Sequence, residues 1–275
     1  MIDVHTHLHP PKLFAAIRRW FAERSTWDLS SHPTDPADVA AALRAEGVER
    51  FVFFSYAHKP GIARDLNAWL NATARDLDGF GLPLGTVHPD DPEYLEDVRL
   101  ALDAGCLGIK LHEDVQRLAV DDVRFDPVYR ELAARGAFLL AHVGPIPWAY
   151  PPDEGAARIE RVLERHPGLN IVVAHYGTPD TRRYFTLMDE HPRLHLDTTM
   201  VFAADSLVGN ERDFDVALLE SHAERVLYGT DFPNIPHAYD SERRGIEALA
   251  LTRGARAAIF HDNAARLIAQ ATANR

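Results

Sequence analysis

The feature that most constrains the fold of this chain is a regular alternation of short apolar runs with longer stretches of helical periodicity. Eight apolar runs, each bounded by turn residues, lie at 2–4, 50–55, 81–87, 106–111, 137–141, 170–174, 193–196 and 225–228. Helical periodicity is found between them at 36–46, 61–77, 92–104, 127–135, 155–165 and 214–221. Several of these stretches carry a helix start signal, such as Asp35 before Pro36 and Asp126 before Pro127.

Strict alternation of strands and helices predicts parallel strands with helical crossovers, and eight such units that close on themselves form a (β/α)8 TIM barrel. The runs are apolar throughout, as expected of strands that are buried on both faces. The main alternative, an open doubly wound sheet, would carry a glycine-rich phosphate turn after the first strand. This chain has His-Thr-His-Leu-His-Pro at 5–10 instead. We therefore predict one α/β barrel domain over residues 1–275.

The charge of the chain limits its partners. A formal net charge of −12 argues against nucleic acid and anionic membranes as partners, because both bind basic surfaces. The sequence has no signal peptide and no apolar run long enough to span a bilayer, so we expect a cytoplasmic protein that acts on a small molecule. Cys106 is the only cysteine, which excludes intramolecular disulfides and thiolate metal clusters. Nothing in the sequence identifies an oligomer interface.

Side chains suited to metal binding recur where the predicted strands end. They are His5, His7, Lys110, His142, His175 and Asp231. The carboxyl ends of all strands of a barrel meet on one face, which carries the active site in this fold. His5 and His7 are two positions apart on a strand, so their imidazoles lie on the same side and are able to bind one ion. The sequence therefore predicts a metal site on this face.

Lys110 stands out because only three of the 29 basic residues are lysine. A lysine that is buried beside a dication has a lowered pKa, and its neutral amine is able to take up CO₂ or to exchange protons. Arginine does neither, so we predict a chemical role for Lys110. His112 follows two residues later on the same side of the strand, and we predict that it contacts the substrate.

Several motifs along the chain resemble the amidohydrolase superfamily. They are Asp3-Val-His-Thr-His, Gly108-Ile-Lys-Leu-His, Val173-Ala-His-Tyr-Gly, Leu196-Asp-Thr-Thr, Tyr228-Gly-Thr-Asp-Phe-Pro and Asn263-Ala-Ala-Arg-Leu. The resemblance covers nearly the whole chain. It is strongest to the amidohydrolase-related branch of metal-dependent TIM-barrel hydrolases, which includes aminocarboxymuconate-semialdehyde decarboxylase.

This resemblance implies that His5, His7, His142 and Asp231 bind one divalent metal, while His175 faces the substrate. Other branches of the superfamily hold two metals bridged by a carboxylated lysine, and Lys110 occupies the corresponding strand. One or two metals therefore both fit the motifs. Zinc is favoured, although histidine and aspartate also suit manganese, iron or cobalt.

Our principal hypothesis for the function is a metal-dependent hydrolase. The cation lowers the pKa of bound water, Asp231 takes the proton as general base, and His175 or Lys110 stabilises the developing oxyanion. The substrate would be a small amide, ester or lactone.

Two alternatives remain. The first is a metal-dependent lyase, a decarboxylase or hydratase that acts on a small unsaturated carboxylic acid, with Arg117 as a candidate cation for the substrate. The second is a metal-binding barrel without catalysis, although structural zinc sites are normally closed by four protein ligands that are rich in cysteine. Further candidates to line the pocket are His9, His58, His237, Trp148 and Tyr150.

Overall fold

The computed structural model describes residues 1–144, 154–203 and 215–273. Within these residues the chain forms parallel strands in sequence order. They are β1 (Ile2–His7), β2 (Arg50–Phe54), β3 (Gly81–Pro83), β4 (Gly108–His112), β5 (Phe138–His142), β6 (Asn170–Val173), β7 (Leu194–Asp197) and β8 (Val226–Leu227). Strands β1 to β3 pair in one sheet and β4 to β8 in a second, each in sequence order.

Backbone hydrogen bonds join the two sheets into a closed barrel. Between β3 and β4, the Gly85 carbonyl accepts from the Lys110 N–H at 2.8 Å. Between β8 and β1, the Val4 N–H donates to the Tyr228 carbonyl at 2.9 Å and the Asp231 N–H donates to the His5 carbonyl at 2.8 Å. The predicted (β/α)8 barrel is confirmed.

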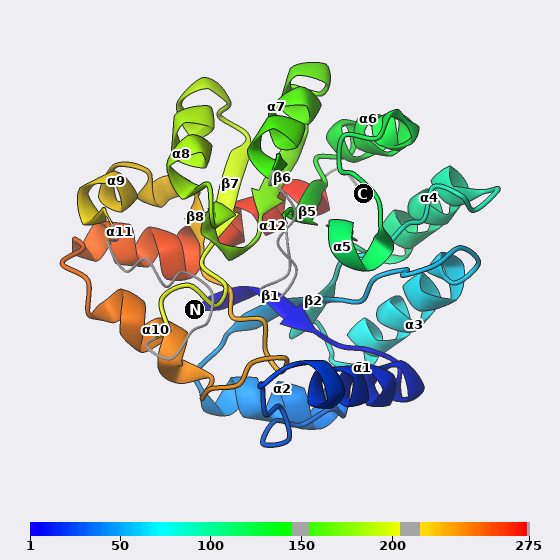
Figure 1. Ribbon diagram of the computed structural model, residues 1–275, viewed down its shortest axis with the longest axis horizontal. Helices are drawn as coiled ribbons and strands as arrows, with labels where there is room; N and C mark the ends of the chain where they lie inside the picture. The colour runs from blue at the N-terminus through cyan, green and yellow to red at the C-terminus, as the bar shows by residue number, and fades with distance from the viewer. Residues whose placement is uncertain (145–153, 204–214, 274–275) are drawn as a thin grey trace.

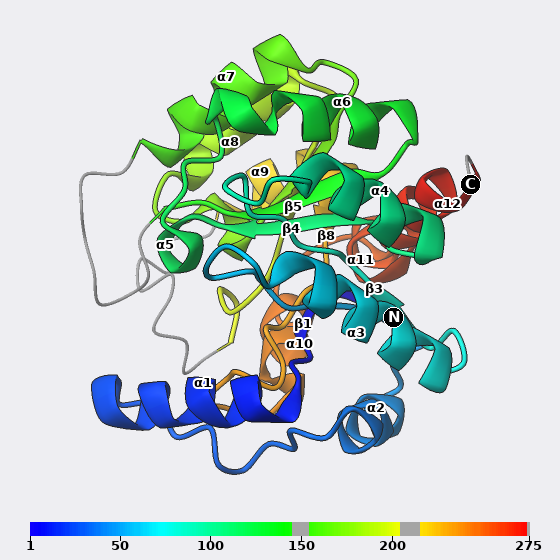
Figure 2. The same cartoon turned by 90° about the vertical axis from the view of Figure 1, so that its right-hand side faces the viewer.

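Helices surround the strands, as Figure 1 shows. They are α1 (Pro11–Arg24), α2 (Pro36–Ala45), α3 (Ala63–Asp76), α4 (Tyr94–Ala104), α5 (Glu113–Gln116), α6 (Asp126–Ala134), α7 (Gly155–Arg165), α8 (Thr181–Glu190), α9 (Val216–Ser221), α10 (Asp240–Glu247), α11 (Arg253–Ala257) and α12 (Asn263–Ala273). In the side view of Figure 2, α1 and α2 lie on one side of the strands, with α6 and α7 on the opposite side.

Two apolar clusters bury both faces of the strands. One contains alternate strand residues such as Val4, Phe54 and Leu140 together with Leu267 of α12, and the other lies between the strands and the surrounding helices. This double burial explains why the strands are apolar throughout in the sequence. In Figure 1, α12 lies behind the strands, so it covers the barrel interior from that end.

The structure differs from the sequence prediction in several local features. Helix α1 was not predicted, because Phe14 is its only fully buried residue and its apolar periodicity is therefore weak. Strand β3 is shorter than the predicted run at 81–87 and continues only as a bridge from Gly85 to Ile109. Trp148, Tyr150 and the first residue of the predicted helix at 214–221 lie outside the described residues. Across the described ranges, no helix combines the length and the apolar character that a membrane span requires.

Candidate metal centre

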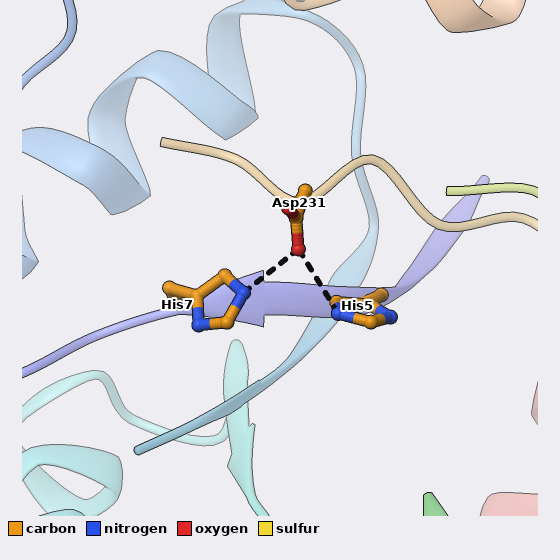
Figure 3. A group of neighbouring side chains, drawn as sticks. All are labelled: His5, His7 and Asp231. Carbon is orange, nitrogen blue, oxygen red and sulfur yellow. Dashed lines mark hydrogen bonds and ion pairs between the residues drawn. The ribbon is translucent and has the colours of Figure 1, made fainter. Parts of the chain in front are cut away.

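The predicted metal site brings three side chains together at the carboxyl end of the barrel. His5 and His7 project from β1, and Asp231 follows β8 (Figure 3). The Asp231 Oδ1 lies 3.0 Å from the His5 Nε2 and 2.8 Å from the His7 Nε2. One donor atom from each residue lies within 4.8 Å of the others, which is a spacing that fits a metal ion.

The approach of Asp231 to β1 depends on the backbone after β8. Gly229 packs so closely there that an added Cβ would lie 2.5 Å from the Thr199 Oγ1 and 2.8 Å from the His5 Cβ. Asp231 itself has a left-handed backbone with a φ of 75°, and its N–H donates to the His5 carbonyl. Non-glycine residues rarely adopt this conformation outside sites where the surrounding structure enforces it. The Gly-Thr-Asp segment is therefore shaped to present Asp231 to the two histidines.

Asp197, the last residue of β7, completes the surroundings of His5. Its Oδ2 lies 2.7 Å from the His5 Nδ1, and its Oδ1 accepts the backbone N–H of His175 at 3.0 Å. The motif Leu196-Asp-Thr-Thr contains this residue, but no role for it is predicted from the sequence. Like the other candidates, it lies at the carboxyl end of a barrel strand.

Burial and charge act in opposite directions on the ionisable groups of this cluster. Burial would raise the pKa of Asp231, but His7 and His5 outweigh it and hold the pKa of this carboxyl well below its usual range. Burial lowers the pKa of His7, although Asp231 opposes the change. At neutral pH the cluster therefore contains an anionic carboxylate beside a neutral imidazole, and this donor set suits a divalent cation.

His142, the predicted fourth ligand, lies beside this group. Its Nδ1 is 2.8 Å from the Nε2 of His175, and the His5 and His175 ring centroids are 5.4 Å apart. The His175 Nδ1 lies 3.2 Å from the Thr199 carbonyl, which only accepts hydrogen bonds, so this nitrogen carries a proton. His142 is therefore linked to the cluster through His175, and it is not among the residues whose donor atoms lie within 4.8 Å of one another.

His112 stacks on His142, with the ring centroids 3.9 Å apart and the ring planes 11° from parallel. Burial, followed by the charge of Lys110, lowers the pKa of His112 well below its ordinary value. His112 is thus a neutral ring at the mouth of the barrel, in a position that fits the predicted substrate contact.

Lys110 lies inside the barrel with no exposed surface. Its Nζ has no hydrogen-bond partner within the described residues and lies 4.7 Å from the centroid of the Phe54 ring. Burial lowers the pKa of Lys110 to about 7, against the attraction of Asp197 and Asp231. An unpartnered buried amine is costly, which makes this lysine a strong candidate for a chemical role.

The remaining pocket candidates from the sequence divide into two groups. His9 is buried, its ring lies 5.6 Å from that of His7, and its Nδ1 is 2.9 Å from the Ser55 Oγ. His237 is buried as well. His58 and Arg117, in contrast, are exposed.

Tyr56 is a ring at the site that the sequence analysis did not identify. Its ring centroid lies 5.9 Å from that of His7, 5.7 Å from that of His9 and 5.3 Å from that of His112. It follows β2, and the candidate predicted from the sequence after this strand is His58, two residues further on. The position at a strand end was the only available signal.

Comparisons with known proteins connect the chain to an enzyme family and to curated relatives. The family model described as Amidohydrolase matches residues 2–269. Among curated proteins, the chain is similar to 6-methylsalicylic acid decarboxylase from Penicillium expansum, with 24% identity over 281 residues and coverage of 86% of each protein.

Two solved structures resemble the chain over nearly its whole length. One is 2,6-dihydroxybenzoate decarboxylase complexed with 2,6-dihydroxybenzoate, with a TM-score of 0.71, 20% identity, and coverage of 97% of this chain and 98% of that one. The other is 5-carboxyvanillate decarboxylase from Novosphingobium aromaticivorans complexed with manganese, with a TM-score of 0.72, 17% identity, and coverage of 97% and 95%. At these identities the likeness shows the barrel fold.

Proposed function

The chain belongs to the amidohydrolase family, and we propose that it is a metal-dependent decarboxylase of a small aromatic carboxylic acid. The observation that carries the proposal is the cluster of His5, His7 and Asp231 at the mouth of the barrel. Decarboxylation was the alternative to hydrolysis in the sequence analysis, and the comparisons favour it over that principal hypothesis.

The named relatives suggest the class of substrate. 6-Methylsalicylic acid and 2,6-dihydroxybenzoate are benzoic acids with a hydroxyl group next to the carboxylate, and 5-carboxyvanillate is an aromatic acid as well. Because this chain shares the family and the fold, we propose a hydroxybenzoic acid as its substrate.

Decarboxylation breaks the bond between the ring carbon and the carboxyl carbon. The electron pair stays on the ring, CO₂ leaves, and a proton must reach the ring carbon. A divalent cation held by His5, His7 and Asp231, with His142 as a fourth donor, would bind the acidic substrate and stabilise negative charge. Manganese is present in one relative, while the sequence motifs favoured zinc, and both suit this donor set.

The residues proposed to act on the substrate surround the cation site. Asp231, which is anionic at neutral pH, is proposed to take a proton from the substrate hydroxyl or from water and to pass it to the ring carbon. His175 and Lys110 are proposed to stabilise the developing charge. Lys110 supports this assignment because its amine is buried and unpartnered within the described residues. His112 presents its ring beside His142 and is proposed to contact the substrate.

A barrel with a purely structural ion fits these observations less well. Structural sites normally close the coordination of the metal with protein ligands. Here three buried nitrogen atoms without a hydrogen-bond partner among the described residues adjoin the site, namely the Lys110 Nζ, the His7 Nδ1 and the His9 Nε2. Such groups are expected where a ligand completes their hydrogen bonds.

The test is a substrate screen with CO₂ detection. The protein is stripped with a chelator, reloaded with Mn²⁺ or Zn²⁺, and incubated with 2,6-dihydroxybenzoate, 6-methylsalicylate, an aryl ester and a lactone. We expect CO₂ and the matching phenol in equal amounts from a hydroxybenzoate, only in the reloaded protein. Cleavage of the ester or lactone without CO₂ from the acids would instead support the hydrolase.

A matched pair of variants assigns the activity to the site. Asp231→Asn is expected to lose turnover, whereas Asp189→Asn alters a carboxylate that pairs with His222 at 3.0 Å elsewhere and should keep it. Full activity of Asp231→Asn would exclude the proposed role of this residue.

A further inference from the structure

Gln116, the last residue of α5, bonds three separate strand ends with one side chain. Its Oε1 accepts the backbone N–H of His112 at 2.8 Å. Its Nε2 donates to the Val87 carbonyl at 2.9 Å and to the Ala57 carbonyl at 3.2 Å. The side chain is buried, with 4% of the residue exposed, so these bonds are shielded from competing water.

These three bonds lie beside one of the two places where the barrel lacks a regular strand ladder, between β3 and β4. Strand β3 ends at Pro83, and only an isolated bridge from Gly85 to Ile109 continues its pairing with β4. Beyond that bridge, the segments that follow β2 and β3 are tied to the end of β4 through the Gln116 amide. Thr86 adds one more connection, since its Oγ1 accepts the Ala57 N–H at 2.9 Å.

The residue that Gln116 holds most directly is His112. Besides the bond to its backbone N–H, the His112 Nδ1 accepts the N–H of Val115 at 3.5 Å, within the same turn. The two contacts fix both the backbone and the ring of His112. The ring stacks on His142 and touches the ring of Tyr56, whose next residue, Ala57, is also bonded to Gln116.

We infer that Gln116 is a positioning residue for the reaction. It holds the His112 ring in a fixed position relative to the ends of β2 and β3. Gln116 does not itself touch the reacting atoms in this inference. The inference rests on the proposed function in one respect, namely that His112 faces the substrate. It predicts that an error in the placement of His112 lowers turnover without loss of the cation.

A double-mutant cycle tests whether Gln116 acts through His112. Gln116→Met keeps the size of the side chain and removes all three hydrogen bonds. We expect it to lower kcat/KM for 2,6-dihydroxybenzoate by about 10- to 100-fold, as is typical when a hydrogen-bond partner that orients a site residue is lost. In a His112→Ala background the same change should cost no more than about threefold, because interacting residues are not additive. The metal content should stay at the wild-type level in all four proteins.

Asn71 provides the matched control. It is equally buried, and its Nδ2 donates to the carbonyls of Asn67 and Ala101, away from the barrel mouth. Asn71→Leu therefore removes a buried amide that has no contact with His112, and it should leave kcat/KM within about twofold of wild type, as for a change remote from the site. Equal losses in Asn71→Leu and Gln116→Met, or full additivity of Gln116→Met with His112→Ala, would overturn the inference.

A spectroscopic measurement separates this inference from the proposed function. If no hydroxybenzoate is turned over, the proposed substrate class fails, and the imidazole ¹⁵N shifts of the zinc-loaded protein still report on His112. The His112 signals are assigned with His112→Ala. They should move in Gln116→Met and stay unchanged in Asn71→Leu. Unmoved His112 signals in Gln116→Met would overturn the positioning role whatever the substrate proves to be.

Discussion

Asp197 holds the Nδ1 of His5 at 2.7 Å from its Oδ2, on the side of the imidazole opposite to Asp231. The charges of His5 and His175 together with hydrogen bonds outweigh burial and lower the pKa of Asp197, so this carboxylate is an acceptor and the His5 Nδ1 donates. With a proton held on Nδ1, Nε2 is the nitrogen through which His5 would bind a cation, and it lies 3.0 Å from Asp231. This carboxylate–histidine pair prepares His5 to bind a cation.

Replacement of Asp197 by Asn should weaken metal binding. The asparagine side chain carries no negative charge, so it no longer favours a proton on the His5 Nδ1. We therefore expect the affinity for Mn²⁺ or Zn²⁺ to fall by about 10- to 100-fold in a calorimetric titration. Asp126→Asn is the control, because Asp126 pairs with His166 at 2.9 Å in another part of the structure. An unchanged affinity in Asp197→Asn would show that His5 does not depend on this partner.

Gly229 sets how closely the segment after β8 approaches β1. A methyl group there would clash with the Thr199 Oγ1 and the His5 Cβ, so Gly229→Ala should push Asp231 away from the two histidines. We expect loss of bound metal in elemental analysis. Gly168→Ala is the control, since its Cβ would meet only Ala133 at an ordinary 3.7 Å. Equal metal content in the two variants would contradict the role of Gly229.

Lys110 should make the stability of the metal-free protein depend on pH. Its pKa is about 7 in the folded chain, against an ordinary value of 10.5. Between these values the unfolded chain binds more protons, so stability rises with pH from about 7 to about 10.5, by at most about 1.4 kcal/mol per pH unit. Below pH 7 the full cost of burying the charged amine is present.

Lys110→Met isolates this effect, because it replaces the buried amine with an apolar side chain of similar length. Urea unfolding after chelation should find the variant more stable than wild type at pH 7, with the difference shrinking towards pH 9. A difference that stays constant over this range would mean that Lys110 titrates alike in the folded and unfolded chain. Its activity should fall in the reloaded protein although its stability rises.

The sequence was sufficient to predict the barrel and the meeting of His5, His7 and Asp231. Both follow from rules that need no side-chain detail, namely the alternation of elements and the convergence of strand ends. Two-residue spacing along a strand then places His5 and His7 on the same side.

The partners of each side chain could not be predicted in this way. Periodicity tells which side of a strand a residue faces, but not which atom of a neighbouring strand it meets. The bond from His5 to Asp197 and the pairing of His142 with His175 depend on the spacing and twist of strands that are distant in sequence. Tyr56 escaped attention because tyrosine is common in cores, and only its contacts place it at the mouth.

The most direct measurement of the central claim is anomalous X-ray diffraction from crystals of the protein loaded with Mn²⁺ or Zn²⁺, combined with metal content per chain. We predict one ion at about 2.0–2.2 Å from the Nε2 atoms of His5 and His7 and an Oδ atom of Asp231. An ion that binds elsewhere, or no ion between these three residues at full loading, would contradict the account.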